Sequence, residues 1–280
     1  MNVLAFTSLI VLGALAAGFL GALTGLGGGV VIVPLLVLMG VDIKYAIGAS
    51  LVSVIATSSG AAASYVKEGY SNIRIGMLLE IATTFGALTG AYLVELIPTG
   101  GLSIVFGLVL LLSAYLSLRS RRRHFETEKA DPLAVRLRLD SSYPTPEGRQ
   151  PYHVQGVPLG FALMYGAGCL SGLLGIGSGA LKVLAMDQAM RIPFKVSTTT
   201  SNFMIGVTAA ASAGVYLHRG QIVPGLAMPV MLGVLIGSLL GARVLMSAQP
   251  RILRRVFSVV ILVLAIQMMY KGWTALMGKV

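Results

Sequence analysis

Residues 18–29 read GFLGALTGLGGG, and residues 168–179 read GCLSGLLGIGSG. Four glycines of the first stretch recur as glycines 150 positions later: Gly18, Gly25, Gly27 and Gly29. A second pair of stretches follows the first at nearly the same offset, because GALTGA at 86–91 returns as GSLLGA at 237–242. Matches that hold their spacing over such a distance indicate a duplication of about 110 residues.

The composition around these stretches is typical of an α-helical membrane protein. Apolar residues make up 56% of the chain and charged residues 11%, with a mean hydropathy of +0.86. A soluble domain carries about 25% charged residues. Six further apolar runs each approach the roughly 20 residues that cross a bilayer as a helix: Ile47–Val66, Ile75–Leu96, Leu102–Leu118, Val196–Leu217, Ile222–Met246 and Val256–Leu276. We therefore expect an all-α polytopic protein in a cell membrane of the bacterial inner-membrane type.

Residues 119–156 form the one long polar stretch of the sequence. The run RSRRRH at its start directly follows an apolar segment, and such basic clusters normally mark the cytoplasmic side. We expect a poorly ordered cytoplasmic connector between two membrane halves, residues 1–118 and 157–280, acting only as a tether. The chain has a net charge of +11, but aromatic residues are not interleaved with the basic ones of the connector, so we expect no nucleic-acid partner.

The two glycine stretches lie inside apolar segments that are too long for one crossing. Val3–Met39 would extend about 55 Å as a helix, and Val157–Met186 is also long. Glycines near the middle of each segment should break the helix, which predicts a helical hairpin with its tip inside the membrane. Non-helical backbone at that depth must be buried in protein or line a wet cavity. The helix that leaves each tip offers free N–H groups to an anion; the alternative is that the glycines only allow tight helix packing.

Taken together, these motifs resemble the sulfite exporter TauE/SafE family. The resemblance rests on the glycine segment, the hydroxyl-rich helix after it and the GxLxGA motif, each present twice around the polar connector. It implies a permease for sulfite or small organosulfur anions. Repeats of whole membrane units are typical of secondary transporters, whose substrate site lies near the membrane midplane between the repeats.

The expected substrate-binding residues are the glycines of the two tips and polar residues of the helices that follow: Gly27, Gly28, Gly29, Ser50, Ser53, Gly177, Ser178, Gly179, Lys182, Thr199 and Asn202. Asn202 is included because a side-chain amide in hydrocarbon requires a partner.

Two charged residues within the apolar runs leave alternatives open, since each charge is costly there. Lys182 either neutralises an anionic substrate or extends to the membrane surface. Glu80 is either a coupling residue that accepts a proton, or it lies near the membrane face and pairs with Arg74 or Lys67. The second reading of Glu80 is favoured by the sequence.

The sequence thus predicts a secondary permease of small oxyanions, with sulfite or an organosulfonate as the leading class, working by alternating access. We expect two inverted repeats, each a glycine-broken hairpin plus three transmembrane helices, with both termini outside. The alternatives are an anion channel and a membrane-embedded enzyme. We expect no catalytic residue, no metal and no cofactor. The expected partners are a small anion and the lipid bilayer, and a homodimer is left open.

Overall fold

The computed structural model describes residues 3–24, 28–67, 71–118, 131–145, 148–245 and 250–278. Before the connector the chain forms α1 (Val3–Thr24), α2 (Gly29–Leu38), α3 (Ile43–Lys67), α4 (Ile73–Leu93), the short turn η1 (Val94–Leu96) and α5 (Thr99–Leu118). The connector contains α6 (Pro132–Arg136), β1 (Ser141–Thr145) and β2 (Gly148–Tyr152). After it come α7 (Val157–Leu174), α8 (Gly179–Leu184), the π-helical turn η2 (Ala185–Ala189), α9 (Phe194–His218), α10 (Pro224–Leu245) and α11 (Pro250–Leu276).

The described helices have the lengths and surfaces of membrane spans. Four are long and apolar enough to cross a bilayer: Ile73–Leu96, Val157–Leu174, Pro224–Gly241 and Ser258–Leu276. Shorter apolar helices lie beside them. Large apolar side chains such as Phe85, Leu232 and Ile266 are exposed on the outer surface, as expected where lipid replaces water. The predicted polytopic helical membrane protein is confirmed.

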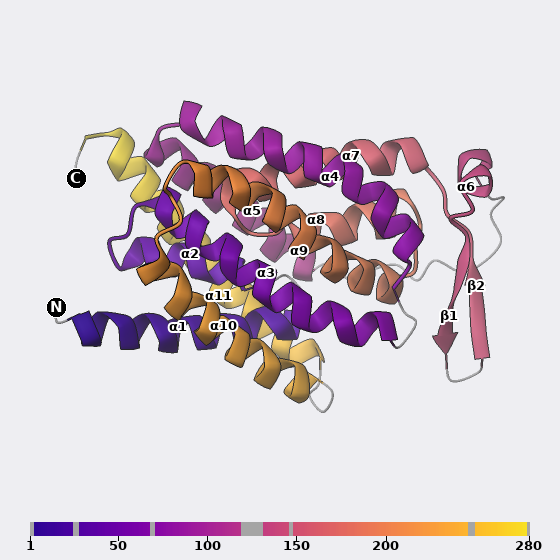
Figure 1. Cartoon of the computed structure of the whole chain (residues 1–280), viewed down its shortest axis with the longest axis horizontal. Helices are drawn as coiled ribbons and strands as arrows, with labels where there is room; N and C mark the ends of the chain where they lie inside the picture. Colours follow the sequence, from indigo (N-terminus) through magenta and orange to yellow (C-terminus); the bar gives the residue numbers. More distant parts are fainter. Residues whose placement is uncertain are drawn as a thin grey trace.

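Each main helix contact joins a helix before the connector to one after it. α1 packs on α10, α4 on α7, α5 on α11 and α3 on α9, with further contacts of α4 with α9 and of α3 with α10. Figure 1 shows α4 and α7 running side by side along one edge of the bundle. The two halves are therefore interleaved in the core rather than placed next to each other as separate domains.

Glycines allow the closest of these helix contacts. A Cβ atom added at Gly86 would lie 2.1 Å from the Tyr165 carbonyl oxygen, and one at Gly237 would lie 2.0 Å from the Leu15 carbonyl oxygen. Gly18 and Gly168 face equally close backbone atoms. Small residues let membrane helices approach until backbone meets backbone. For these glycines, which lie outside the hairpin tips, tight packing is the correct explanation.

The same contacts give the relative directions of the helices. Gly233 approaches Val11 and Gly237 approaches Leu15, so α1 and α10 run parallel. α5 and α11 run antiparallel, because Gly100 faces Gly272 whereas Gly107, later in α5, faces Met269. Figure 1 shows the start of α1 and the end of α11 at one end of the bundle and the connector at the other.

The connector is ordered where it is described, which corrects the expectation of a poorly ordered tether. β1 and β2 form an antiparallel hairpin in which Ser141 pairs with Tyr152. Buried connector residues join one apolar cluster with residues of the membrane helices: Ala134, Leu139, Tyr152 and Val154 with Ile75, Leu79, Met186 and Met190. The proline and charge content of the segment concealed these few apolar anchors. Residues 119–130, which include the basic run, lie outside the described residues.

Candidate functional site

Both long apolar segments are interrupted at their glycines, as the sequence predicts. α7 ends at Leu174 because Gly175 takes a positive φ of 67° and caps the helix with its N–H on the Ser171 carbonyl. Gly177 also has a positive φ, of 69°, and Ser178 follows with a φ of 45°. These are left-handed conformations that glycine adopts without strain and that L-residues rarely adopt.

In the first half the corresponding break lies between the end of α1 and the start of α2. Gly28 precedes α2 and is buried, whereas Gly27 lies outside the described residues. The carbonyl oxygen of Gly28 accepts the N–H groups of Val31 and Ile32. This leaves the N–H groups of Gly29 and Val30 at the open end of α2, where a helix has no partner of its own for them.

The two tips meet inside the bundle. A Cβ atom at Gly29 would lie 2.8 Å from the Gly175 carbonyl oxygen and 2.6 Å from the Ser50 hydroxyl oxygen. The Ser50 hydroxyl itself donates to the Gly175 carbonyl at 2.8 Å. Ser50, fully buried in α3, therefore holds the second tip against the first.

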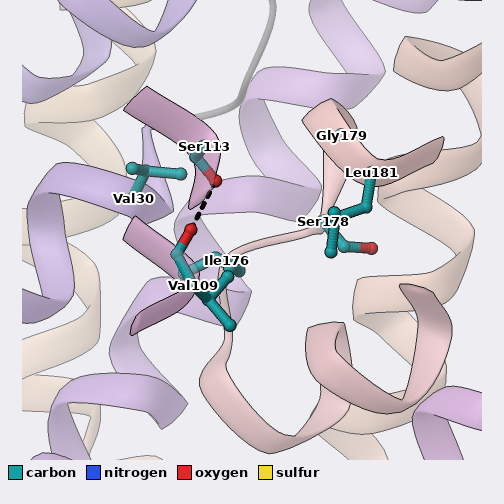
Figure 2. A pocket seen from close by; sticks show the side chains of 7 residues that line it. All are labelled: Val30, Val109, Ser113, Ile176, Ser178, Gly179 and Leu181. Carbon is teal, nitrogen blue, oxygen red and sulfur yellow. Dashed lines mark hydrogen bonds between the residues drawn. The ribbon is translucent and has the colours of Figure 1, made fainter. Parts of the chain in front are cut away.

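A small cavity of about 10 Å³ lies where the tips meet, room for roughly one water molecule. It is lined by residues that follow each tip and by residues of α5: Val30, Val109, Ser113, Ile176, Ser178, Gly179 and Leu181 (Figure 2). The Ser113 hydroxyl donates to the Val109 carbonyl of its own helix at 2.8 Å. In this conformation the cavity is too small for a sulfur oxyanion, so loading such an ion requires the tips to move apart.

Ser178 contributes an unpaired hydroxyl to this region. The residue is 3% exposed, and its hydroxyl has no hydrogen-bond partner among the described residues. Figure 2 shows this hydroxyl on the side of Ser178 that faces away from Ser113 and Val30. A buried hydroxyl without a partner carries a desolvation cost, which a ligand or a water molecule at the tip would relieve.

Lys182 and Glu80 lie on either side of a threonine hydroxyl in the interior. Lys182, in α8, is fully buried and its ammonium donates to the Thr208 hydroxyl at 2.5 Å. Thr208, in α9, donates to Glu80 Oε1 at 2.7 Å. The side chain of Lys182 therefore does not extend to the membrane surface.

The favoured pairing of Glu80 with Arg74 is also wrong. The Arg74 guanidinium donates to the Arg138 carbonyl in the connector at 3.3 Å, while Glu80 is 7% exposed and faces α9. The side chain of Lys67, the other expected partner, lies outside the described residues. A glutamate one to two helical turns from an arginine favours a surface pair on sequence grounds, but the burial of this face of α4 turns Glu80 inward.

Three other candidates from the sequence do not reach the cavity in this conformation. The Ser53 hydroxyl donates to the Ser50 carbonyl at 2.7 Å, and the Thr199 hydroxyl donates to the Lys195 carbonyl at 3.0 Å. Such bonds within a helix are common for serine and threonine. The backbone carbonyl of Asn202 accepts the Ser58 hydroxyl at 2.6 Å, which joins α9 to α3.

Several residues near the tips were not singled out from the sequence. Thr208 bridges the two buried charges, and Val109 and Ser113 bring α5 to the cavity. Tyr216 is fully buried and its hydroxyl donates to the Gly172 carbonyl at 2.9 Å, close to the end of α7. Nothing in the local sequence indicates a role for Thr208. A tyrosine near the end of an apolar run, such as Tyr216, does suggest a buried hydroxyl that bonds a carbonyl at the end of another helix.

The interleaved helices and the apolar outer surface define a multi-pass membrane protein, with two buried tips in its interior. The chain belongs to the sulfite exporter TauE/SafE family, whose profile matches residues 10–268.

Curated relatives are described as probable membrane transporter proteins. YunE of Bacillus subtilis is 30% identical over 96% of this chain and 99% of the relative. YdhB of Bacillus subtilis is 31% identical over 81% of this chain and 83% of the relative. A probable membrane transporter protein of Xylella fastidiosa is 27% identical over 93% of this chain and 94% of the relative. No solved structure matches the chain significantly.

Proposed function

We propose that this protein is a secondary transporter of small anions, with sulfite or organosulfur and sulfonate compounds as the leading class. Transport is by alternating access at a midplane site formed by the two glycine-rich tips. The observation that carries the proposal is the meeting of the tips, since a single cavity is lined by Val30 after the first tip and by Ile176, Ser178 and Gly179 at the second. The family description, sulfite exporter, supports the substrate class.

The chemistry of the tips suits an oxyanion. The N–H groups at the start of α2 and the Ser178 hydroxyl, which has no partner among the described residues, provide donors in the buried region around the tips. Helix starts also carry the positive end of the helix dipole. Lys182 adds a full positive charge in the first turn of α8, and a buried cation is best satisfied by an anion.

We further propose that the two halves are inverted repeats. If the two halves are exchanged, the pair α1–α10 takes the place of the pair α7–α4. The pairs α3–α9 and α5–α11 are each exchanged with themselves. All four pairs are in contact. The glycine contacts support the same exchange, because Gly18 faces Val234 and Gly168 faces Thr83. Parallel packing within the exchanged pairs and antiparallel packing of α5 with α11 are expected for a two-fold axis in the membrane plane.

A channel is the main alternative, since a channel differs from a carrier only in lacking an occluded state. A membrane-embedded enzyme is more distant, and the transporter relatives favour transport. The small size of the cavity between the tips favours a carrier, because the tips must separate before an anion can enter or leave.

The proposal is tested by anion flux into proteoliposomes that contain the purified protein. We expect uptake of sulfite or methanesulfonate that saturates with concentration and shows counterflow. Ser178→Leu should abolish it, because the substitution puts a bulky side chain into a buried position of the tip and removes the hydroxyl donor. The matched control is Gly166→Leu on α7, where nothing lies within 4 Å of an added Cβ. Flux in the Ser178→Leu variant equal to that of the wild type would place the site elsewhere, and flux without saturation would indicate a channel.

A further inference from the structure

The buried pair of charges next to the second tip is not explained by anion binding at the tips alone. Lys182 and Thr208 are fully buried, and Glu80 is 7% exposed. They come from three elements, α8, α9 and α4, and they are linked by hydrogen bonds of 2.5 Å and 2.7 Å. Buried charges of this kind in a membrane protein are costly and usually serve a function.

Hydrogen-bond chemistry fixes the direction of these bonds. An ammonium group can only donate, so Thr208 accepts from Lys182 and gives its own proton onward, to Glu80 Oε1 or to the Met204 carbonyl at 3.0 Å. Glu80 Oε1 also accepts the Thr84 hydroxyl at 3.2 Å. Oε1 is therefore the oxygen through which Glu80 is joined to Thr208 and, through Thr208, to Lys182. When Glu80 is ionised, its charge balances that of Lys182.

The second carboxylate oxygen is in a different situation. Glu80 Oε2 is buried and has no hydrogen-bond partner among the described residues. A proton can therefore bind Oε2 without breaking either bond to Oε1. Protonation would remove the negative charge and leave Lys182 as a buried cation with no counter-charge.

Lys182 is the charged group positioned to act on Glu80. The other titratable or charged side chains described on α4, on the elements packed against it and on the continuation of α8 are Arg74, Tyr92, Glu95, Tyr165, Cys169, Asp187, Lys195, Tyr216 and His218, with Arg219 directly after α9. Arg74 bonds the connector and Tyr216 bonds the end of α7. Lys182, in contrast, is joined to Glu80 through the hydrogen-bonded hydroxyl of Thr208.

The backbone of Lys182 lies directly after the second tip. The Lys182 N–H donates to the Ser178 carbonyl at 3.0 Å, so the lysine belongs to the first turn after the break. The positions that correspond by the sequence offset are Ile32 and Thr57 in the first half, for Lys182 and Thr208, and Met231 in the second half, for Glu80; none of them carries a charge. The charged network thus belongs to one tip only, which is where an anion and a proton would act together.

We propose that Glu80 and Lys182 form a proton-linked anion site, in which a proton on Glu80 Oε2 frees Lys182 to neutralise an anion at the second tip. The inference rests on the proposed transport function and adds its coupling ion. The proton comes from the aqueous phase and replaces the carboxylate charge, and one unit of anion charge takes over the pairing with Lys182. A monovalent sulfonate therefore moves together with one proton and without net charge transfer.

The test uses methanesulfonate, which keeps a single negative charge from about pH 5 to about pH 9 and so reports only protonation of the protein. Its affinity for the purified full-length protein is measured by calorimetry across this range. For the wild type we expect affinity to fall about tenfold per pH unit once Glu80 is ionised, because binding then takes up one proton. Glu80→Gln imitates the protonated residue and should bind with the high affinity of low pH at every pH. Lys182→Met should bind weakly throughout.

Controls separate folding from coupling. Thermal stability of the double variant Glu80→Gln/Lys182→Met shows whether the fold tolerates loss of both charges, and we expect it to melt close to the wild type. Thr208→Val removes the bridging hydroxyl and should shift the pH dependence. Thr57→Val is its matched control, because the Thr57 hydroxyl bonds the Val54 carbonyl of its own helix, and it should leave the pH dependence unchanged.

The possible failures are distinguishable. If methanesulfonate binds and Glu80→Gln keeps the pH dependence of the wild type, the proton link is wrong while the proposed function stands. If neither methanesulfonate nor sulfite binds the wild type at any pH, the proposed function falls and this inference falls with it.

Discussion

At the scale of single residues, the second tip depends on backbone conformations that few residues can adopt. Gly175 combines a φ of 67° with close neighbours, since an added Cβ would lie 2.8 Å from Ile47 Cγ2 and 3.0 Å from its carbonyl oxygen. Both effects oppose any side chain at this position, and the conformational one alone costs about 1 kcal/mol or more.

Gly175→Ala should therefore lower the free energy of unfolding by at least about 1–2 kcal/mol, from backbone strain and from contact with Ile47. Gly166→Ala, within α7 and facing open space, should change it by less than about 1 kcal/mol and in the stabilising direction. Thermal and denaturant unfolding in detergent provide the measurement. Equal effects of the two substitutions would show that the tip tolerates a side chain.

Residue-level reasoning from the sequence succeeded where the signal was local and failed where it was not. The glycines of GIGSG break the helix because of their own conformational freedom, which needs no knowledge of the fold. The burial of Lys182 depends on Thr208 and Glu80. Thr208 lies 26 residues from Lys182 in the sequence, and Glu80 lies 128 residues from Thr208. No pattern near Lys182 reveals that these side chains converge.

At the scale of elements, the connector is a structural part of the membrane domain. Asn72, between α3 and α4, donates from Nδ2 to the Leu139 carbonyl at 3.1 Å and to the Tyr152 hydroxyl at 2.7 Å. Its backbone N–H donates to the Thr200 hydroxyl of α9. Burial raises the pKa of the Tyr152 phenol, so the tyrosine stays neutral at physiological pH and keeps its place in the network. The connector is thus joined to α4 and α9 at once.

This anchoring gives a matched pair of variants. Leu139 is 2% exposed in the connector cluster, whereas Leu137, two residues earlier, is 42% exposed. Leu139→Ala should destabilise the hairpin by about 2–4 kcal/mol, the usual cost of an emptied buried leucine, and Leu137→Ala by less than about 0.5 kcal/mol.

Hydrogen exchange at the backbone amides of β1 and β2 measures the stability of the hairpin directly. Exchange in the Leu139→Ala variant should approach that of an unfolded segment while α4 and α7 stay protected. If both variants exchange as the wild type does, the packing of the connector on the membrane helices contributes little.

At the scale of the whole molecule, the two halves are interleaved, and the family match at residues 10–268 covers both of them. α1 packs mainly on α10, and α7 packs mainly on α4. The first helix of each hairpin therefore lies against the other half, whereas α2 and α8 contact α3 and α9 of their own half. The duplicated motifs are readable in the sequence, whereas the exchange of partners is not, because one-dimensional repeats do not specify which copy packs on which. Figure 1 shows the result, a single bundle with the connector at one end.

The same arrangement accounts for how transport would work. Each tip is carried by a hairpin whose first helix packs tightly on a helix of the other half, through Gly18 on Val234 and Gly168 on Thr83. Under the proposed alternating access, small rotations of the halves relative to each other would open the tips to one side of the membrane at a time.

The most direct test of the central claim is the accessibility of the second tip from the two sides of the membrane. Cys169 is the single cysteine of the chain, so Cys169→Ser provides a background in which Ser178→Cys is the one reactive thiol. Alternating access predicts that a membrane-impermeant methanethiosulfonate reagent modifies this thiol from either side of oriented vesicles, and that saturating methanesulfonate slows modification from both sides. Modification from one side only, or from both sides at rates that methanesulfonate leaves unchanged, would contradict an alternating anion site at the tips.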